Sequence, residues 1–135
     1  MTKAMAGAAA AMLCLGGTVA SAGSAQASGT SCAIKKWGYT GHYKCGSHVV
    51  EADWTANGSV DEVFVVATNR HIYHVWKNAG GWQEMPGGGR ADNTTGYLFW
   101  DGVRRCVIVY VTSNNTHYQN CFSGGKWHNW TVSGG

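Results

Sequence analysis

The side chains of this sequence that could do chemistry are mainly aromatic rings set beside glycines and amides. The 135 residues include 7 Trp, 6 Tyr and 20 Gly but only 7 acidic residues. A sugar ring needs both a flat apolar partner for its C–H face and directed donors and acceptors for its hydroxyls, and Trp, Tyr, Asn, Gln and His supply these. We therefore take Trp127 and Trp130, at the glycine-rich C-terminal end, as candidate stacking surfaces.

Residue patterns for catalysis are weak. His71 and His74 are three apart, and alternation along a strand would place them on opposite faces, which makes a poor metal pair. The acidic residues are scattered; Glu51 and Asp53 would share a strand face, but no other residue marks them as an acid–base pair. We expect a protein without catalytic activity, cofactor or metal.

Charge and the N-terminal sequence indicate an exported protein. The net charge of +3 is too small and too dispersed to predict nucleic-acid binding. Residues 1–27 read as a secretory signal peptide, with Lys3, an apolar run from Ala8 to Val19, and an Ala25-Gln26-Ala27 cleavage site. The apolar run is too short and too rich in glycine for a stable membrane span. We therefore expect a secreted protein with no membrane partner.

Four cysteines remain after that cleavage site, and an even number in a small exported chain predicts two disulfides. They are Cys32, Cys45, Cys106 and Cys121. Four cysteines allow three pairings, of which the local one joins Cys32 to Cys45 and Cys106 to Cys121 across the shortest loops. A zinc site is the competing interpretation, but the sequence has no C-x-x-C pair.

Strand signals are dense and helix signals nearly absent, so we predict an all-β fold. No stretch beyond Ser28 keeps an apolar stripe at helical spacing without interruption by glycine or a turn cluster. Runs of β-branched and aromatic residues alternate with Asn-Gly, Gly-Gly and Ser-Asn turns. The expected strands are Val49–Trp54, Glu62–Thr68, His71–Lys77, Tyr97–Asp101, Cys106–Thr112 and Thr116–Phe122.

An internal repeat organises these strands. Val63–Thr68 recurs as Val107–Thr112, 44 positions later, and Gly80-Gly81 recurs as Gly124-Gly125. A period in the forties with about four short strands per unit is typical of a propeller blade. We divide the chain beyond the signal into a disulfide-bounded segment, 28–47, and two blade-like repeats, about 48–90 and 91–135.

Turn positions predict the strand registers. A two-residue turn at Asn69-Arg70 would place Glu62 opposite Lys77. A turn at Ser113-Asn114 would place Cys106 opposite Cys121, close enough for a disulfide. One position of the repeat would then carry a charge pair in one copy and a disulfide in the other.

Glu62–Thr68 with Ile72–Trp76 and Gly80-Gly81-Trp82 resembles the blade repeat of lectin-type β-propellers. The second copy, ending in Gly124-Gly125-Lys126-Trp127, is similar to the short two-blade fucose-binding lectins. The resemblance covers about Val49 to Gly135 and implies a non-catalytic protein that binds a glycan.

Site residues follow from the same resemblance. Trp82 and Trp127 match the stacking Trp after the glycine pair. The family's sugar-binding acid is matched by His74 and Gln119. Its sugar-binding Arg is replaced in both copies, which argues against fucose itself. We take Trp82, Trp127, Trp130, His74 and Gln119 as the ligand-binding set.

Two interpretations of assembly and of function stay open. Short family members form homotrimers that close a six-bladed ring, whereas two sheets could also pack on each other as a small sandwich or barrel. The alternative function is that of a small secreted interaction protein, of inhibitor or antimicrobial type, with a protein target. In either case, segment 28–47 is expected to be an edge strand closed by a disulfide, with lysines that block aggregation.

Overall fold

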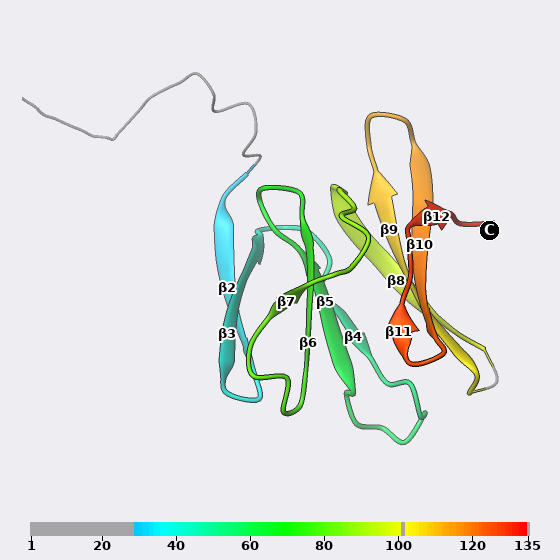
Figure 1. Ribbon diagram of the computed structural model, residues 1–135. Coiled ribbons are helices and arrows are strands. Elements are labelled where there is room, and N and C mark those ends of the chain that lie inside the picture. Colours follow the sequence, from blue (N-terminus) through cyan, green and yellow to red (C-terminus); the bar gives the residue numbers. More distant parts are fainter. Residues whose placement is uncertain (1–28, 101, 135) are drawn as a thin grey trace, which may run out of the picture.

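The computed structural model describes residues 29–100 and 102–134, and every regular element in this part is a β-strand (Figure 1). The all-β prediction is confirmed. The expected signal peptide, residues 1–27, lies outside the described residues. No helix in the described ranges is long and apolar enough to cross a membrane. The strands are β2 (Ser31–Lys36), β3 (Tyr39–Lys44), β4 (Val50–Ala52), β5 (Glu62–Val66), β6 (Ile72–Trp76), β7 (Gln83–Glu84), β8 (Asn93–Trp100), β9 (Arg104–Val111), β10 (Thr116–Ser123), β11 (Lys126–Trp127) and β12 (Thr131–Val132).

These strands form three antiparallel layers that lie side by side in Figure 1. The N-terminal hairpin is β2–β3, the first sheet is β4-β5-β6-β7, and the second sheet is β8-β9-β10-β11 with β12 also paired to β10. The structure therefore consists of several small antiparallel sheets, and the described residues form no closed propeller. Segment 28–47, expected to be a single edge strand, contains this two-stranded hairpin.

The first sheet is the middle layer, and both of its faces are covered. All five residues of β5 are buried, which is typical of a strand packed on both sides. Phe64 and Val66 belong to the hydrophobic core shared with Val107 and Val109 of β9, whereas β3 of the hairpin packs against β5. Alternation along β5 therefore sends one set of side chains to the second sheet and the other set to the hairpin.

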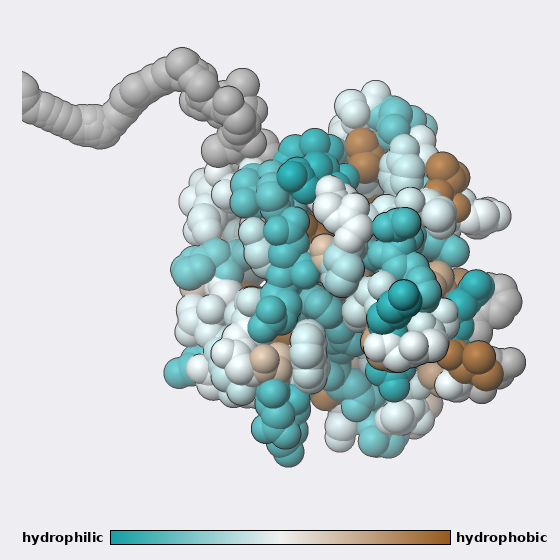
Figure 2. Space-filling view, in the orientation of Figure 1, coloured by the Kyte–Doolittle hydropathy of each residue, from teal (hydrophilic) through white to brown (hydrophobic). Residues whose placement is uncertain are grey.

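The second sheet has one covered face and one open face. Val107, Val109 and Val111 reach the shared core, so Ile108 and Tyr110, which alternate with them, point away from the first sheet. Space-filling colours in Figure 2 show a mostly polar surface in which the hydrophobic side chains are scattered rather than joined into one patch.

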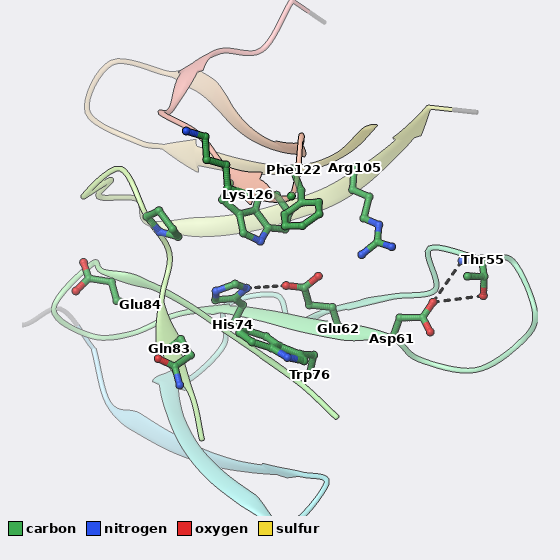
Figure 3. A pocket seen from close by; sticks show the side chains of 13 residues that line it. Thr55, Asp61, Glu62, His74, Trp76, Gln83, Glu84, Arg105, Phe122 and Lys126 are labelled. Carbon is green, nitrogen blue, oxygen red and sulfur yellow. Dashed lines mark hydrogen bonds and ion pairs between the residues drawn. The ribbon is translucent and has the colours of Figure 1, made fainter. Parts of the chain in front are cut away.

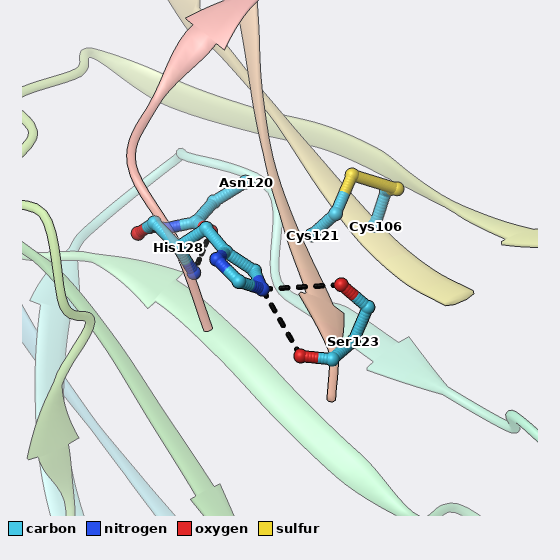
Figure 4. The surroundings of a disulfide bond; sticks show 5 residues. All are labelled: Cys106, Asn120, Cys121, Ser123 and His128. Atoms are coloured by element: carbon cyan, nitrogen blue, oxygen red, sulfur yellow. Dashed lines mark hydrogen bonds between the residues drawn. A yellow bond between two sulfur atoms is a disulfide. The ribbon is translucent and has the colours of Figure 1, made fainter. Parts of the chain in front are cut away.

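Two disulfides are present, as predicted, and of the three possible pairings the structure has the local one. Cys32–Cys45 closes the N-terminal hairpin, with a Cα–Cα distance of 5.1 Å. Cys106–Cys121 joins β9 to β10 at 4.0 Å (Figure 4), and the two residues are direct partners in the strand register, as predicted.

The predicted register of the first hairpin is wrong by one residue. Glu62 lies opposite Trp76, not Lys77. The turn is not Asn69-Arg70 alone, because the N–H of Arg70 bonds to the carbonyl of Ala67 at 2.9 Å and Arg70 takes a φ of 71°. A left-handed residue at the end of a three-residue loop adds one position to the turn and shifts the pairing.

A buried amide fastens the C-terminal segment to the second sheet. Asn120 is fully buried, and its Nδ2 donates to the carbonyls of Pro86 (3.0 Å) and His128 (2.8 Å). Its Oδ1 accepts the N–H of His128 at 2.9 Å, and the His128 ring in turn contacts Ser123 (Figure 4). Every polar atom of the Asn120 side chain is therefore bonded, as a buried amide requires.

Candidate functional site

A cleft of about 840 Å³ opens between the first and second sheets, and side chains of both line it (Figure 3). Clefts of this size are typical of small-molecule binding, and this one combines aromatic rings with many polar side chains. The lining residues are Thr55, Asp61, Glu62, His74, Trp76, Gln83, Glu84 and Pro86 on the side of the first sheet, and Arg105, Phe122, Gly125, Lys126 and Trp127 on the side of the second.

A buried hydrogen-bonded pair, Glu62 and His74, lies in the floor of the cleft. Glu62 of β5 lies opposite Trp76 of β6, and His74 is two residues from Trp76 on the same strand. Glu62 and His74 therefore share one face of the sheet and point to the second sheet. His74 Nδ1 donates to Glu62 Oε2 at 2.6 Å, and Trp54 Nε1 donates to Glu62 Oε1 at 3.0 Å. Both oxygens of the buried carboxylate are thus bonded. The second ring nitrogen of His74 points away from Glu62 in Figure 3, which leaves it available to a ligand.

Aromatic rings hold the His74 imidazole in place. It stacks on Phe64 with ring centroids 5.7 Å apart and an interplanar angle of 18°. Trp76 lies 4.9 Å away, and Trp127 of the second sheet approaches edge-on at 6.0 Å. Trp76 is 37% exposed, so part of its surface stays open to the cleft. The arrangement offers a flat apolar surface beside a directed ring nitrogen.

Arg105 enters the cleft from the opposite wall. Its guanidinium lies over the rings of Phe122 (5.5 Å) and Trp54 (5.9 Å) and points toward the first sheet in Figure 3. Lys126, the other cation in the lining, extends away from that gap. Among the ion pairs of the described residues, none includes Arg105.

A well-bonded loop forms the end of the cleft near Thr55. Asp61 Oδ2 accepts the N–H of Trp54 at 2.8 Å, and Asp53 Oδ2 accepts the N–H of Gly58 at 2.7 Å. Desolvation acts to raise the pKa of Asp53. The backbone N–H groups of Gly58 and Asn57 donate to the carboxylate, and together these hydrogen bonds hold that pKa below its usual value. These bonds fix the loop without the help of a ligand.

The structure brings together two of the five residues in the predicted ligand-binding set, His74 and Trp127. Trp82, expected to be equivalent to Trp127, packs against the N-terminal hairpin instead. Its Nε1 donates to the carbonyl of Tyr39 at 3.2 Å, and a Cβ on Gly41 would come within 2.5 Å of its ring. The role of Trp82 in ligand binding stays a prediction, at a place separate from the cleft.

The other two members lie elsewhere on the second sheet. Gln119 pairs with Ile108 across β9–β10, on the face turned away from the first sheet, and lines a hollow of about 270 Å³. Trp130 packs against the core over Gly89, where a Cβ would meet its ring at 2.5 Å. Gln119 and His74 do hold equivalent register positions, opposite Ile108 and Phe64, but one face is open and the other is covered.

Sequence reasoning missed three residues of the cleft: Glu62 as a partner of His74, Trp76 as an exposed ring, and Arg105. Correct pairing of β5 with β6 would have placed Glu62, His74 and Trp76 on one face. Arg105 belongs to the other sheet, and no local pattern marks it.

Comparisons with protein-family models, curated proteins and solved structures find no match to this chain. Within the described residues, no group of three His, Cys, Asp or Glu side chains is placed to hold a metal ion.

Proposed function

We propose that this protein is a secreted, non-catalytic, lectin-like protein that binds a glycan in the cleft between its two sheets. The observation that carries the proposal is the grouping of Trp76, Trp127 and the hydrogen-bonded His74 in one cleft. A pyranose ring stacks its C–H face on a Trp, and His74 offers its free ring nitrogen to a hydroxyl. Two disulfides fit an oxidising, extracellular location.

Rigidity of the site supports binding. His74 is 3% exposed and is held by Glu62 and three rings, so little side-chain entropy remains to be lost when a ligand arrives. Gln83 also lines the cleft and can donate to and accept from hydroxyl groups.

A titration followed by tryptophan fluorescence tests this function. The oxidised protein is screened against neutral and acidic oligosaccharides, alone and as Trp76→Ala, Trp76→Phe and Phe99→Ala variants. Loss of the stacking ring in Trp76→Ala should weaken binding by about tenfold. Trp76→Phe should retain part of the affinity, and Phe99→Ala is the matched control because Phe99 is 43% exposed and does not line the cleft.

Binding unaffected by Trp76→Ala would remove the cleft from the proposal. If no saccharide changes the fluorescence or the melting temperature, the lectin function itself fails, and the alternative of a secreted protein with a protein target is favoured.

We further propose that the two sheets are blade-type repeats. Phe64 of the first sheet is covered by the second sheet, and its equivalent, Ile108, faces outward. This head-to-tail stacking leaves the outer face of the second sheet open, and in a ring of three chains that face would pack against the N-terminal hairpin that covers the first sheet of the next chain. Light scattering separates the assemblies: a molar mass of three chains supports the ring, and a mass of one chain rejects it.

A further inference from the structure

We infer that the saccharide bound in the cleft is acidic, with a carboxylate that pairs with Arg105. This inference rests on the proposed function and names its ligand class, a sugar acid such as a uronic acid or a sialic acid. Arg105 is half-buried in the lining of the cleft, where its guanidinium lies over the rings of Trp54 and Phe122 and forms no ion pair within the described residues.

The carboxylates in the lining already have partners of their own. Glu62 accepts hydrogen bonds from His74 and Trp54. Asp61 accepts the backbone N–H groups of Trp54 (2.8 Å) and Thr55 (3.3 Å). Glu84 lies 2.9 Å from His71 Nδ1 and 3.9 Å from an Arg90 nitrogen. Neither cation of the lining, Arg105 or Lys126, forms an ion pair within the described residues. Of the two, the Arg105 guanidinium points into the gap (Figure 3), so an anion in the cleft would pair with it.

Arg105 is also suited to recognise a carboxylate rather than to attract charge in general. The guanidinium is planar, and two parallel N–H groups can bond both oxygens of a carboxylate. Contact with the flat rings of Trp54 and Phe122 restricts its orientation while its N–H edge remains free. A long cation such as Lys126, which extends away from the gap, lacks this orientation.

The two walls together define how the ligand would lie. Trp76 and His74 belong to the first sheet and Arg105 to the second, so a sugar in the cleft can stack on a ring and direct a ring-edge carboxylate across to the guanidinium (Figure 3). A neutral sugar would leave the guanidinium unpaired in a partly dehydrated place, which lowers its affinity. We therefore expect the acidic sugar to bind more tightly than a neutral sugar of the same ring count.

Matched saccharide pairs test the inference. Fluorescence titrations compare trigalacturonate with galactotriose, and sialyllactose with the neutral trisaccharide galactosyllactose, for the unmodified protein and for Arg105→Gln, Arg105→Lys and Lys126→Gln. The unmodified protein should prefer one acidic member by about tenfold or more. Arg105→Gln should abolish the preference, and Arg105→Lys should keep part of it. Lys126→Gln, the control, should keep all of it.

Each contrary result has a distinct meaning. Equal affinity for the acidic and neutral members overturns this inference and leaves the lectin function standing. Absence of binding to every saccharide overturns both. A preference that survives Arg105→Gln, or that disappears in Lys126→Gln, overturns the assignment to Arg105. Melting curves verify that the variants are folded, and Arg105→Lys keeps the test decisive if Arg105→Gln is not.

Discussion

The first and second sheets have the same strand order, but the residues at equivalent positions have different roles. Opposite positions on the two central strands hold Glu62 and Trp76 in the first sheet and the Cys106–Cys121 disulfide in the second. The first pair faces a neighbouring sheet and the cleft between them, whereas the second faces outward.

The difference follows from what covers each face. A face covered by another layer can exclude water, so a polar group there needs partners within the protein, and Glu62 has two. That arrangement creates a rigid surface, on which we place the proposed binding site. An outward face gains no stability from a covering layer, and a covalent bond between its strands compensates. The repeat thus gives both sheets the same strand framework, and the covering of one face determines which sheet can hold the proposed binding site.

The largest effect should follow removal of the outward disulfide. A Cys106→Ala, Cys121→Ala double variant loses a bond that closes a sequence separation of 15 residues. Chain-entropy estimates for such a loop give about 3 kcal/mol of lost unfolding free energy. Urea unfolding of the two proteins measures the difference. A loss below about 1 kcal/mol would show that the β9–β10 ladder alone holds the second sheet, and the contrast between the sheets would fail.

A smaller effect is expected at the equivalent position of the first sheet. Glu62→Leu leaves the Trp54 N–H and the His74 ring nitrogen without acceptors, which should lower the unfolding free energy by about 2 kcal/mol. Glu62→Gln should cost less because its amide oxygen still accepts from Trp54. The same urea experiment measures both.

An increase in stability for Glu62→Leu would mean that the pair is kept at the expense of stability, which replacement of buried polar groups sometimes reveals. That result would indicate that Glu62 serves the proposed binding site and does not stabilise the first sheet.

The register of the two central hairpins explains how far the sequence could predict the structure. In the second sheet the strand β9, the strand β10 and the Cys106–Cys121 pairing were all predictable, because the alternation and the turn position agree. In the first sheet, Arg70 has a positive φ that lengthens the turn by one residue. The positive φ of a non-glycine residue could not be predicted from the sequence. The error moved Glu62 away from Trp76 and His74 and hid their shared face.

Packing between the layers is the second feature of the structure that could not be predicted from the sequence. Trp82 and Trp127 follow equivalent glycine pairs, yet one packs on the N-terminal hairpin and the other on the first sheet. Local patterns identify both rings as important but not what each one meets. Arg105 shows the same limit, because its place in the cleft depends on how two separate sheets stack.

The smallest effect concerns an ion pair that ties the two sheets together. Arg70, in the β5–β6 turn, donates from Nε to Asp92 Oδ1 at 2.8 Å, and Asp92 Oδ2 accepts the N–H of Thr112 at 2.7 Å. The hydrogen bond from Arg70 is the main reason that the pKa of Asp92 lies below its usual value, with desolvation acting in the opposite direction. A carboxyl whose pKa is lower when folded stabilises the protein above its unfolded pKa.

Acid titration of stability therefore provides the measurement. The contribution of Asp92 should be complete above about pH 5 and should be lost as the pH falls through its unfolded value toward its lower folded value. Asp92→Asn should cost about 1 kcal/mol at pH 7 and should flatten the acid side of the stability profile. Arg70→Gln, which removes the other partner, should flatten it similarly. If the unfolding free energies of the variant and unmodified proteins fell in parallel with decreasing pH, the apolar core alone would hold the two sheets together.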